Sequence, residues 1–309
     1  MKTIKAFAPA TVANVCCGFD VLGFCVQAPS DEVILTLRQT SGIVIKSIAG
    51  DGGRLSLDPL ENTAGVAIQS FLDRLNISQG VEIELIKNLP LGSGMGSSAA
   101  SAVAAVVGIN YLLGEPLTKK ELIVHVMEAE KVACGSAHAD NAAPCLMGGF
   151  VLIRDYQPLD VVTVPSLADL YCTLIHPHLE LKTADSRKVL RDSISLKDSI
   201  KQSGNIAALM IGLMKPDYDL IGRSLHDVIA EPIRSAFIPG FAEIKNKVMN
   251  TGALGFGISG SGPTVFALSR NPEIAATAGE VARDHFKKTG LPSHVFISSI
   301  NREGVRVEG

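Results

Sequence analysis

The fold of this chain is decided by one glycine-rich stretch, Pro90-Leu91-Gly92-Ser93-Gly94-Met95-Gly96-Ser97-Ser98-Ala99-Ala100. It follows a strand predicted by the alternation of Val81, Ile83 and Leu85, and it runs into an alanine-rich helix. Glycine leaves the backbone N–H groups accessible, and a helix N-terminus favours negative charge. The stretch therefore predicts an anion-binding loop whose ligand is a phosphate group. A turn that only connects two elements would not need hydroxyl groups at the helix start.

Three other nucleotide-binding motifs do not fit this chain. The Walker loop needs a lysine that the stretch lacks, and the residue sets of protein kinases are absent. A second glycine cluster, Gly255–Gly260, matches the G-x-G-x-x-G dinucleotide motif letter for letter. That motif must open a helix, but here Pro263 and a predicted strand, Thr264–Leu268, follow. This context argues against a dehydrogenase and favours a strand–turn–strand unit.

The rest of the chain predicts a mixture of strands and helices. Asn62 is placed to cap one helix, and Thr118 with Glu121 forms a capping box at the start of another. Apolar patterns predict strands at 33–38, 43–46, 81–85, 150–153, 171–175, 254–258, 264–268 and 295–300, and helices at 200–214, 241–249 and 273–288. A turn at Ser41-Gly42 joins the first two strands, and Asp155–Pro165, with two prolines, is the predicted domain boundary. The fold class is therefore α+β.

The composition excludes several classes of protein. At 309 residues the chain is long enough for one large or two modest domains. With 47% hydrophobic and 19% charged residues it has ample apolar surface to bury, which excludes disorder. With a net charge of −3, the chain has no excess of positive charge with which to bind nucleic acid or an anionic membrane. The longest apolar run, Ala99–Leu113, is too short for a membrane span, and Pro9 interrupts any signal-peptide core, so we expect a cytoplasmic protein.

The spacing of the cysteines is also consistent with a cytoplasmic protein. They show no C-x-x-C pair and no zinc-binding spacing, so we expect free, buried thiols rather than disulfides. The six positions are Cys16, Cys17, Cys25, Cys134, Cys145 and Cys172.

A third polar stretch follows the helix that Thr118 is predicted to cap. A carboxylate late in this helix would suit a hard cation such as Mg²⁺. Glu128 and Glu130 lie on different helix faces, so at most one of them can face the phosphate loop. Taken alone, both glutamates are equally compatible with a solvated surface, and His138 with a structural role.

Three motifs, in this order, resemble those of the GHMP superfamily of small-molecule kinases. They are Pro9–Asn14 with Gly18-Phe19-Asp20, then Pro90–Ala99, then Ile258–Thr264. His138–Asn141 and Ile238–Phe241 narrow the resemblance to the homoserine kinases within that superfamily. The resemblance covers almost the whole chain.

The resemblance implies a two-domain α+β fold, divided into residues 1–155 and 156–309. The N-terminal, ATP-binding domain would be β-rich and contain a left-handed β-α-β unit, and the C-terminal domain would be ferredoxin-like. The implied activity is ATP- and Mg²⁺-dependent phosphorylation of the L-homoserine hydroxyl, on the route to threonine. Because members are commonly dimers, the resemblance also implies a homodimer.

The resemblance assigns roles to single residues as well. The glycine-rich stretch would wrap the ATP phosphates with Asn62 near the adenine, and Ser98 and Glu130 would hold Mg²⁺. The residues around the substrate would be Asn14, Asp20, His138, Asn141, Arg187 and Arg234. In these roles Asp20 suits an α-ammonium group, and the two arginines suit a carboxylate, which a guanidinium binds through two hydrogen bonds.

Asn141 stands where several members of the superfamily have an aspartate near the attacking hydroxyl. An amide cannot accept a proton at neutral pH, so Asn141 can only orient the hydroxyl. Phosphoryl transfer through a loose transition state leaves little work for a base. We therefore expect direct in-line transfer, with Asn141, Glu130 and Ser98 as the residues of catalysis. A second departure is Val15-Cys16-Cys17, where members often have Leu-Gly-Pro.

Three alternative functions are less consistent with the sequence. A kinase for a mevalonate-like alcohol would not need Asp20, because its substrate carries no amine. A ligand sensor without catalysis would not need both Ser98 and Glu130, because it has no use for the metal. A dehydrogenase does not fit the context of the second glycine cluster.

Overall fold

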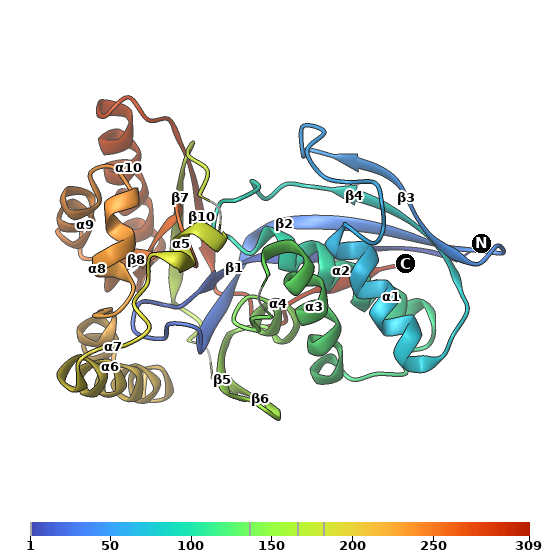
Figure 1. The fold of residues 1–309 in the computed structure, drawn as a ribbon. Coiled ribbons are helices and arrows are strands. Elements are labelled where there is room, and N and C mark those ends of the chain that lie inside the picture. Colours follow the sequence, from blue (N-terminus) through green and yellow to red (C-terminus); the bar gives the residue numbers. More distant parts are fainter. Residues whose placement is uncertain (1, 136, 166, 182) are drawn as a thin grey trace.

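The structure is a computed structural model that describes residues 2–135, 137–165, 167–181 and 183–309. The side chains of residues 133, 134 and 184 are outside this description, and with them the predicted thiol of Cys134. In the described part of the chain the strands form two sheets, which lie next to each other along the long axis of the molecule (Figure 1). Both termini lie on the side of the first sheet that is remote from the second (Figure 1).

The first sheet has the strand order β11-β1-β2-β4-β3, with β5 paired to β2 and β6 to β5. The strands are β1 (Thr3–Ala13), β2 (Leu22–Arg38), β3 (Gly42–Ala49), β4 (Gly80–Ile86), β5 (Phe150–Tyr156), β6 (Leu159–Val164) and β11 (Arg306–Glu308). β2 and β3 are consecutive in the chain but do not pair, because β4 lies between them. β3 and β4 pair in parallel and are connected by α1 (Thr63–Leu75), which gives the expected β-α-β unit. The left-handed sense of this unit stays a prediction.

Helices α1, α2 (Ser97–Leu112), α3 (Lys119–Cys134) and α4 (Ala142–Met147) pack on one face of the first sheet (Figure 1). Asn62 caps α1 by accepting a hydrogen bond from the Ala64 amide, and Thr118 and Glu121 form the predicted capping box of α3. α2 is buried on nearly every side against β1 and β2, which explains its alanine-rich sequence. Its small residues allow close approach, because a Cβ on Gly108 would lie only 2.7 Å from Leu35 Cδ1.

The second sheet has the order β10-β7-β9-β8, and every neighbouring pair is antiparallel. Its strands are β7 (Tyr171–Pro177), β8 (Gly255–Ile258), β9 (Val265–Ser269) and β10 (Ser293–Ser299). The helices around it are α5 (Thr183–Lys188), α6 (Leu196–Met214), α7 (Tyr218–Ser224), α8 (Glu231–Arg234), α9 (Phe241–Met249) and α10 (Pro272–Lys288), with a 3₁₀ turn η1 (Ser235–Phe237). Counted along the chain from β7, the four strands lie side by side in the order 4-1-3-2, and α10 connects the third strand to the fourth. This is the predicted ferredoxin-like arrangement. The second glycine cluster forms the predicted strand–turn–strand unit, β8 and β9.

One hydrophobic core extends across both sheets, and a second, smaller cluster lies between the second sheet and helices α9 and α10. The ring of Phe24 in β2 lies 4.7 Å from Phe150 in β5 and 6.0 Å from Phe266 in β9, measured between ring centroids. This contact holds the end of the first sheet against the second and fixes the place where they meet. β6 and β11, although both follow residue 155, belong to the first sheet. The division at residue 155 stays a prediction.

The cysteine prediction is confirmed for the five side chains that the structure describes. They are free and buried, at Cys16, Cys17, Cys25, Cys145 and Cys172. Burial raises the pKa of the thiol at each of these positions. Among the described residues, no helix has both the length and the apolar character to cross a bilayer.

Candidate active site

A cavity of about 600 Å³ opens where the two sheets meet, at the start of α2. This volume is in the range that small-molecule sites occupy. The predicted site residues that line it are Asn14, Asp20, Asn62, Leu91, Gly92, Ser93, Gly94, Gly96, Ser97, Ser98, Glu130, His138, Asn141, Arg187 and Arg234. Four members of the predicted phosphate loop are not part of its lining: Pro90, Met95, Ala99 and Ala100. The last three are fully buried, so they support the loop from beneath.

The glycine-rich loop turns its carbonyl groups toward the protein. Three consecutive carbonyl oxygens accept hydrogen bonds from outside the loop, Ser93 from the Thr264 amide at 3.0 Å, Gly94 from the Ser259 hydroxyl at 2.7 Å and Met95 from the Thr11 amide at 3.1 Å. With the carbonyls engaged, the N–H groups are left to face the cavity. In the described structure the amides of Gly94, Gly96, Ser97 and Ser98 have no protein acceptor. The loop therefore has the donors that anion binding requires.

The alternation of glycine in this loop has a conformational cause. Gly92, Gly94 and Gly96 have φ of +65°, +82° and +71°, a region that residues with a Cβ rarely adopt. Space is also short, because a Cβ on Gly96 would lie 2.0 Å from the Thr11 hydroxyl oxygen. Any side chain at these positions would strain the loop or push it out of place.

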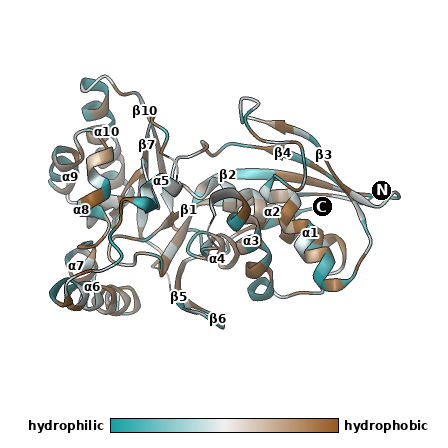
Figure 2. Ribbon diagram, viewed as in Figure 1, coloured by the Kyte–Doolittle hydropathy of each residue, from teal (hydrophilic) through white to brown (hydrophobic). Residues whose placement is uncertain are grey.

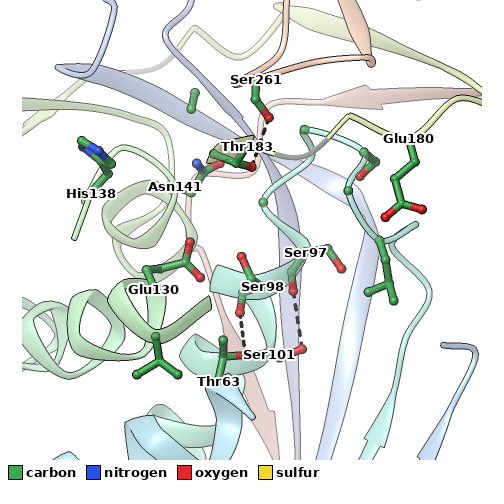
Figure 3. Close-up of a pocket in the computed structure, with 18 of the residues that line it drawn as sticks. Thr63, Ser97, Ser98, Ser101, Glu130, His138, Asn141, Glu180, Thr183 and Ser261 are labelled. Carbon is green, nitrogen blue, oxygen red and sulfur yellow. Dashed lines mark hydrogen bonds between the residues drawn. The ribbon is translucent and has the colours of Figure 1, made fainter. Parts of the chain in front are cut away.

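Ser98 and Glu130 meet at the inner wall of the cavity (Figure 3). Glu130 comes from the last turns of α3, and its carboxylate is hydrogen-bonded to the Ser98 side chain. Glu130 is 9% exposed whereas Glu128 is exposed, which confirms that only one of the two glutamates can face the loop. Burial raises the pKa of Glu130 to about 7, so its carboxylate is stabilised by any cation that binds beside it.

The donor set of Ser98 and Glu130 fits Mg²⁺. A hydroxyl and a single carboxylate are hard oxygen ligands, and Mg²⁺ in kinases takes its remaining ligands from phosphate and water. This end of the cavity is therefore compatible with a metal that arrives with a phosphate chain.

The other end of the cavity combines one carboxylate with two guanidinium groups. Arg187 contacts Asp20 through both Nη atoms, one of them at 3.2 Å. Arg234 is 4% exposed and donates to the carbonyl oxygens of Ser186 at 3.2 Å and Gly260 at 3.0 Å. Both guanidinium groups also lie over the Phe19 ring, at 5.6 Å and 5.3 Å from its centroid. An anionic and a cationic group side by side are complementary to a zwitterion.

Asn14 shapes this end of the cavity through its backbone and its amide. Its φ is +73°, its Nδ2 donates to Gly260 at 2.9 Å, and its Oδ1 accepts from the Asp20 amide at 3.0 Å. Val15 and Cys16 continue the left-handed turn with φ of +43° and +58°. The unusual residues of the first motif therefore form a strained loop, which presents Asp20 to the cavity.

Asn141 and His138 line the same cavity as Asp20 and Glu130. The Thr11 hydroxyl donates to Asn141 Oδ1 at 2.7 Å, so the amide NH₂ remains to serve a ligand. The His138 ring packs edge-on against Tyr156, and burial lowers the pKa of its imidazole, which is neutral at pH 7. At Asn141 the structure thus offers a hydrogen-bond donor rather than a base.

Several cavity residues were not predicted from the sequence. Lys87 is buried and donates to the Ser97 carbonyl and the Ser101 hydroxyl, both at 2.7 Å, and to Asp31. Its ammonium group therefore ties the residue that follows β4 to the first two turns of α2. Burial, followed by the charges of Asp20 and Glu130, raises the pKa of the Asp140 carboxyl to about 7. Arg54 and Glu180 also line the cavity. Isolated charged residues such as these carry no local pattern, so only the folded chain brings them together.

Comparison with known proteins gives consistent matches along the chain. Residues 62–149 match the family described as GHMP kinases N terminal domain, and residues 196–288 match GHMP kinases C terminal. A homoserine kinase from Chlorobium phaeobacteroides is 53% identical over 99% of this chain and 100% of its own length. A homoserine kinase from Xylella fastidiosa is 39% identical over 98% of this chain and 93% of its own length. The crystal structure of homoserine kinase from Cytophaga hutchinsonii superposes with a TM-score of 0.97 at 52% identity, covering 100% of this chain and 98% of that one.

Proposed function

The chain belongs to the GHMP kinases, and on that premise we propose that it is an ATP:L-homoserine O-phosphotransferase of threonine biosynthesis. Relatives that bear the name homoserine kinase match it over nearly the full chain. One observation supports the choice of an amino-acid substrate above all others. Asp20, Arg187 and Arg234 lie together in the lining of the cavity, which also contains Ser98 and Glu130. A zwitterion can exchange with the Asp20–Arg187 pair, with its ammonium group on the carboxylate and its carboxylate on the arginines.

At the nucleotide end, the loop amides receive the phosphate chain of ATP, and Asn62 and its neighbours in α1 lie beside the base. Ser98 and Glu130 would hold Mg²⁺, which would supply positive charge to neutralise the transferring phosphoryl group. The fixed loop amides supply donors that need no reorganisation during the transfer. Most of the catalytic effect then comes from positioning and from charge stabilisation.

The acceptor hydroxyl is oriented by Asn141 in this proposal. The Oδ1 of Asn141 accepts from the Thr11 hydroxyl and its NH₂ group can donate to the acceptor hydroxyl oxygen, but an amide is too weak a base to take the proton. The proton leaves with the phosphorylated product or passes to a phosphate oxygen as the bond forms. The transfer is therefore direct and in line, without a protein base.

A panel of alcohols tests the substrate assignment. We expect rapid ADP release with L-homoserine, and a kcat/KM at least about 100-fold lower with 4-hydroxybutanoate or 3-aminopropan-1-ol, which lack the ammonium or the carboxylate group. The loss arises because each analogue leaves Asp20 or the arginines without their partner. Turnover of another alcohol in preference to homoserine would contradict the substrate but not the kinase class.

We also propose that the protein is a cytoplasmic homodimer. Its buried free thiols suit a reducing compartment. α6 lies at the edge of the molecule, with hydrophobic residues along its length (Figure 2). The exposed ones form one stripe, with exposed fractions of 77% for Leu196, 64% for Ile200, 46% for Ile211 and 64% for Met214. At 1.5 Å per residue the stripe is about 27 Å long, which suits packing against the same helix of a second copy.

Replacing Ile200 with glutamate tests this surface. We expect the variant to be monomeric in analytical ultracentrifugation, because a carboxylate cannot be buried unpaired at an apolar interface. Its free energy of unfolding as a monomer should change by less than about 0.5 kcal/mol, because Ile200 is largely exposed. Lys201→Glu, on the neighbouring face of the same helix, is the control and should stay dimeric. A dimeric Ile200→Glu protein would place the interface elsewhere.

A further inference from the structure

One arginine at the nucleotide end of the cavity is paired with a carboxylate from the other half of the chain. Arg54 lies between β3 and α1, and its Nη1 is 2.8 Å from Oε2 of Glu180, which follows β7. Both residues line the cavity. Figure 3 shows Glu180 across the loop serines from Glu130, so the pair closes the side of the cavity away from the Ser98–Glu130 contact.

The backbone around Arg54 directs its side chain. The Asp51 carboxylate accepts hydrogen bonds from the amides of Gly53 at 3.1 Å and Leu55 at 3.0 Å, which fixes the turn. Arg54 Nε donates back to the Asp51 carbonyl oxygen at 3.1 Å. The stem of Arg54 is thereby held, while its two Nη groups reach over the edge of the cavity.

Glu180 lies against the first glycine of the phosphate loop. A Cβ on Gly92 would lie 2.7 Å from Glu180 Cγ and 3.2 Å from its Oε1. A phosphate chain entering the loop therefore comes close to this carboxylate, and like charges repel. The Glu180 carboxylate stands where an anionic ligand of Arg54 would be.

The other cations of the described cavity lining are either held inside the protein or belong to the proposed substrate end. In the described lining, Lys87 is bound to Asp31 and the first two turns of α2, Arg187 to Asp20, and Arg234 to two carbonyl groups. The Arg54–Glu180 pair differs, because its side chains are 51% and 53% exposed. An ion pair this exposed contributes little free energy and can exchange its partner at low cost.

We propose that Arg54 is a ligand of the nucleotide's phosphate chain, and that Glu180 pairs with it until the nucleotide binds. This inference rests on the proposed function, since it takes ATP as the occupant of the loop. On binding, Arg54 exchanges its hydrogen bond to the Glu180 carboxylate for bonds to phosphate oxygens, which carry more charge and can accept two hydrogen bonds from one guanidinium group. The exchange favours nucleotides with a phosphate chain over the nucleoside alone.

Calorimetric titration of ATP, ADP and adenosine, without homoserine, tests the proposal independently of turnover. For Arg54→Met we expect about tenfold weaker ATP binding, the loss of one charge-assisted contact, and adenosine binding within about twofold of the unchanged protein. Arg54→Lys should recover part of the loss. Glu180→Gln should tighten ATP binding about threefold, and this gain should be at least halved when Arg54→Met is also present.

The control is Arg154→Met, which removes another exposed arginine that is paired with Asp160 on the β5–β6 hairpin and does not line the cavity. It should bind ATP like the unchanged protein. The inference would be overturned if Arg54→Met bound ATP as tightly as the unchanged protein does. It would also be overturned if Arg54→Met lost as much affinity for adenosine as for ATP, because that result would indicate a disordered loop. Absence of ATP binding to the unchanged protein would instead overturn the proposed function.

Discussion

Replacing Glu130 with glutamine is expected to lower kcat about 100- to 1,000-fold, the effect of losing one preorganised electrostatic group. The variant keeps the shape of the side chain and its hydrogen-bonding capacity toward Ser98, but it removes the anionic ligand for Mg²⁺. KM for L-homoserine should change little, because Glu130 lies at the nucleotide end of the cavity. Steady-state kinetics at saturating ATP and Mg²⁺ measure both quantities.

Glu128→Gln is a matched control on the same helix, since Glu128 is exposed and faces away from the loop. It should retain the kcat of the unchanged protein. If Glu130→Gln also turned over at the normal rate, Glu130 would have no part in the metal site.

The stability of the Glu130→Gln protein gives a second, independent measurement. Burial raises the pKa of Glu130 to about 7 from its ordinary value of 4.5, so in the absence of ligands the folded state retains the proton to higher pH than the unfolded chain. The stability that this proton provides is present below the unfolded pKa and is lost as the pH rises through 7. Glutamine does not ionise, so the variant should gain up to about 3 kcal/mol relative to the unchanged protein between pH 5 and pH 8. Denaturant unfolding at the two pH values tests this.

Asn141→Asp is the sharpest test of transfer without a base. We expect kcat to fall about 100-fold, because a carboxylate that accepts from Thr11 presents a negative oxygen, not an N–H donor, to the reacting groups. The anion would also repel the phosphoryl group as it transfers. The pH profile of kcat should show no new acidic limb, since the new carboxylate does not act as a base.

Asn141→Ala removes the N–H donor without introducing a charge, so it measures the effect of the donor alone. It should lower kcat only about tenfold, the value of one neutral hydrogen bond in a buried site. A faster Asn141→Asp enzyme with a new acidic limb would mean that a base assists the reaction, and the proposed mechanism would then be wrong.

The glycine-rich loop could be predicted from sequence because its chemistry is local. Strand, loop and helix follow one another in the chain, and alternating positive φ values require glycine at Gly92, Gly94 and Gly96. The same holds for Asn62 and Thr118, whose capping bonds reach only a few residues along the chain. Their identification needed no knowledge of the tertiary structure.

β1 and β6 were not predicted, for physical reasons. β1 alternates between less buried and buried residues only from Thr3 to Ala8, and every residue from Pro9 to Ala13 is buried, so the alternating pattern covers only half of the strand. β6 lies in the proline-containing segment that was interpreted as a domain boundary. In both cases tertiary contacts, rather than a local pattern, stabilise the strand.

The substrate end of the cavity depended on resemblance alone. Asp20, Arg187 and Arg234 come from distant segments, and no spacing connects them. The Asp20–Arg187 pair, the buried Lys87 and the Arg54–Glu180 contact are consequences of how the two sheets meet. Contacts of this kind depend on the tertiary structure and leave no pattern in any single segment of the chain.

The hydrogen bonds between the two glycine clusters limit how such an enzyme can be recombined. Ser93 and Gly94 are bound by Thr264 and Ser259, so the loop that receives phosphate takes its shape partly from the opposite sheet. A chimera that joins the first half of one kinase to the second half of another would have to preserve these contacts in register. Exchanging one half between two kinases would therefore not transfer substrate preference by itself, because the two glycine-rich loops have to come from the same protein.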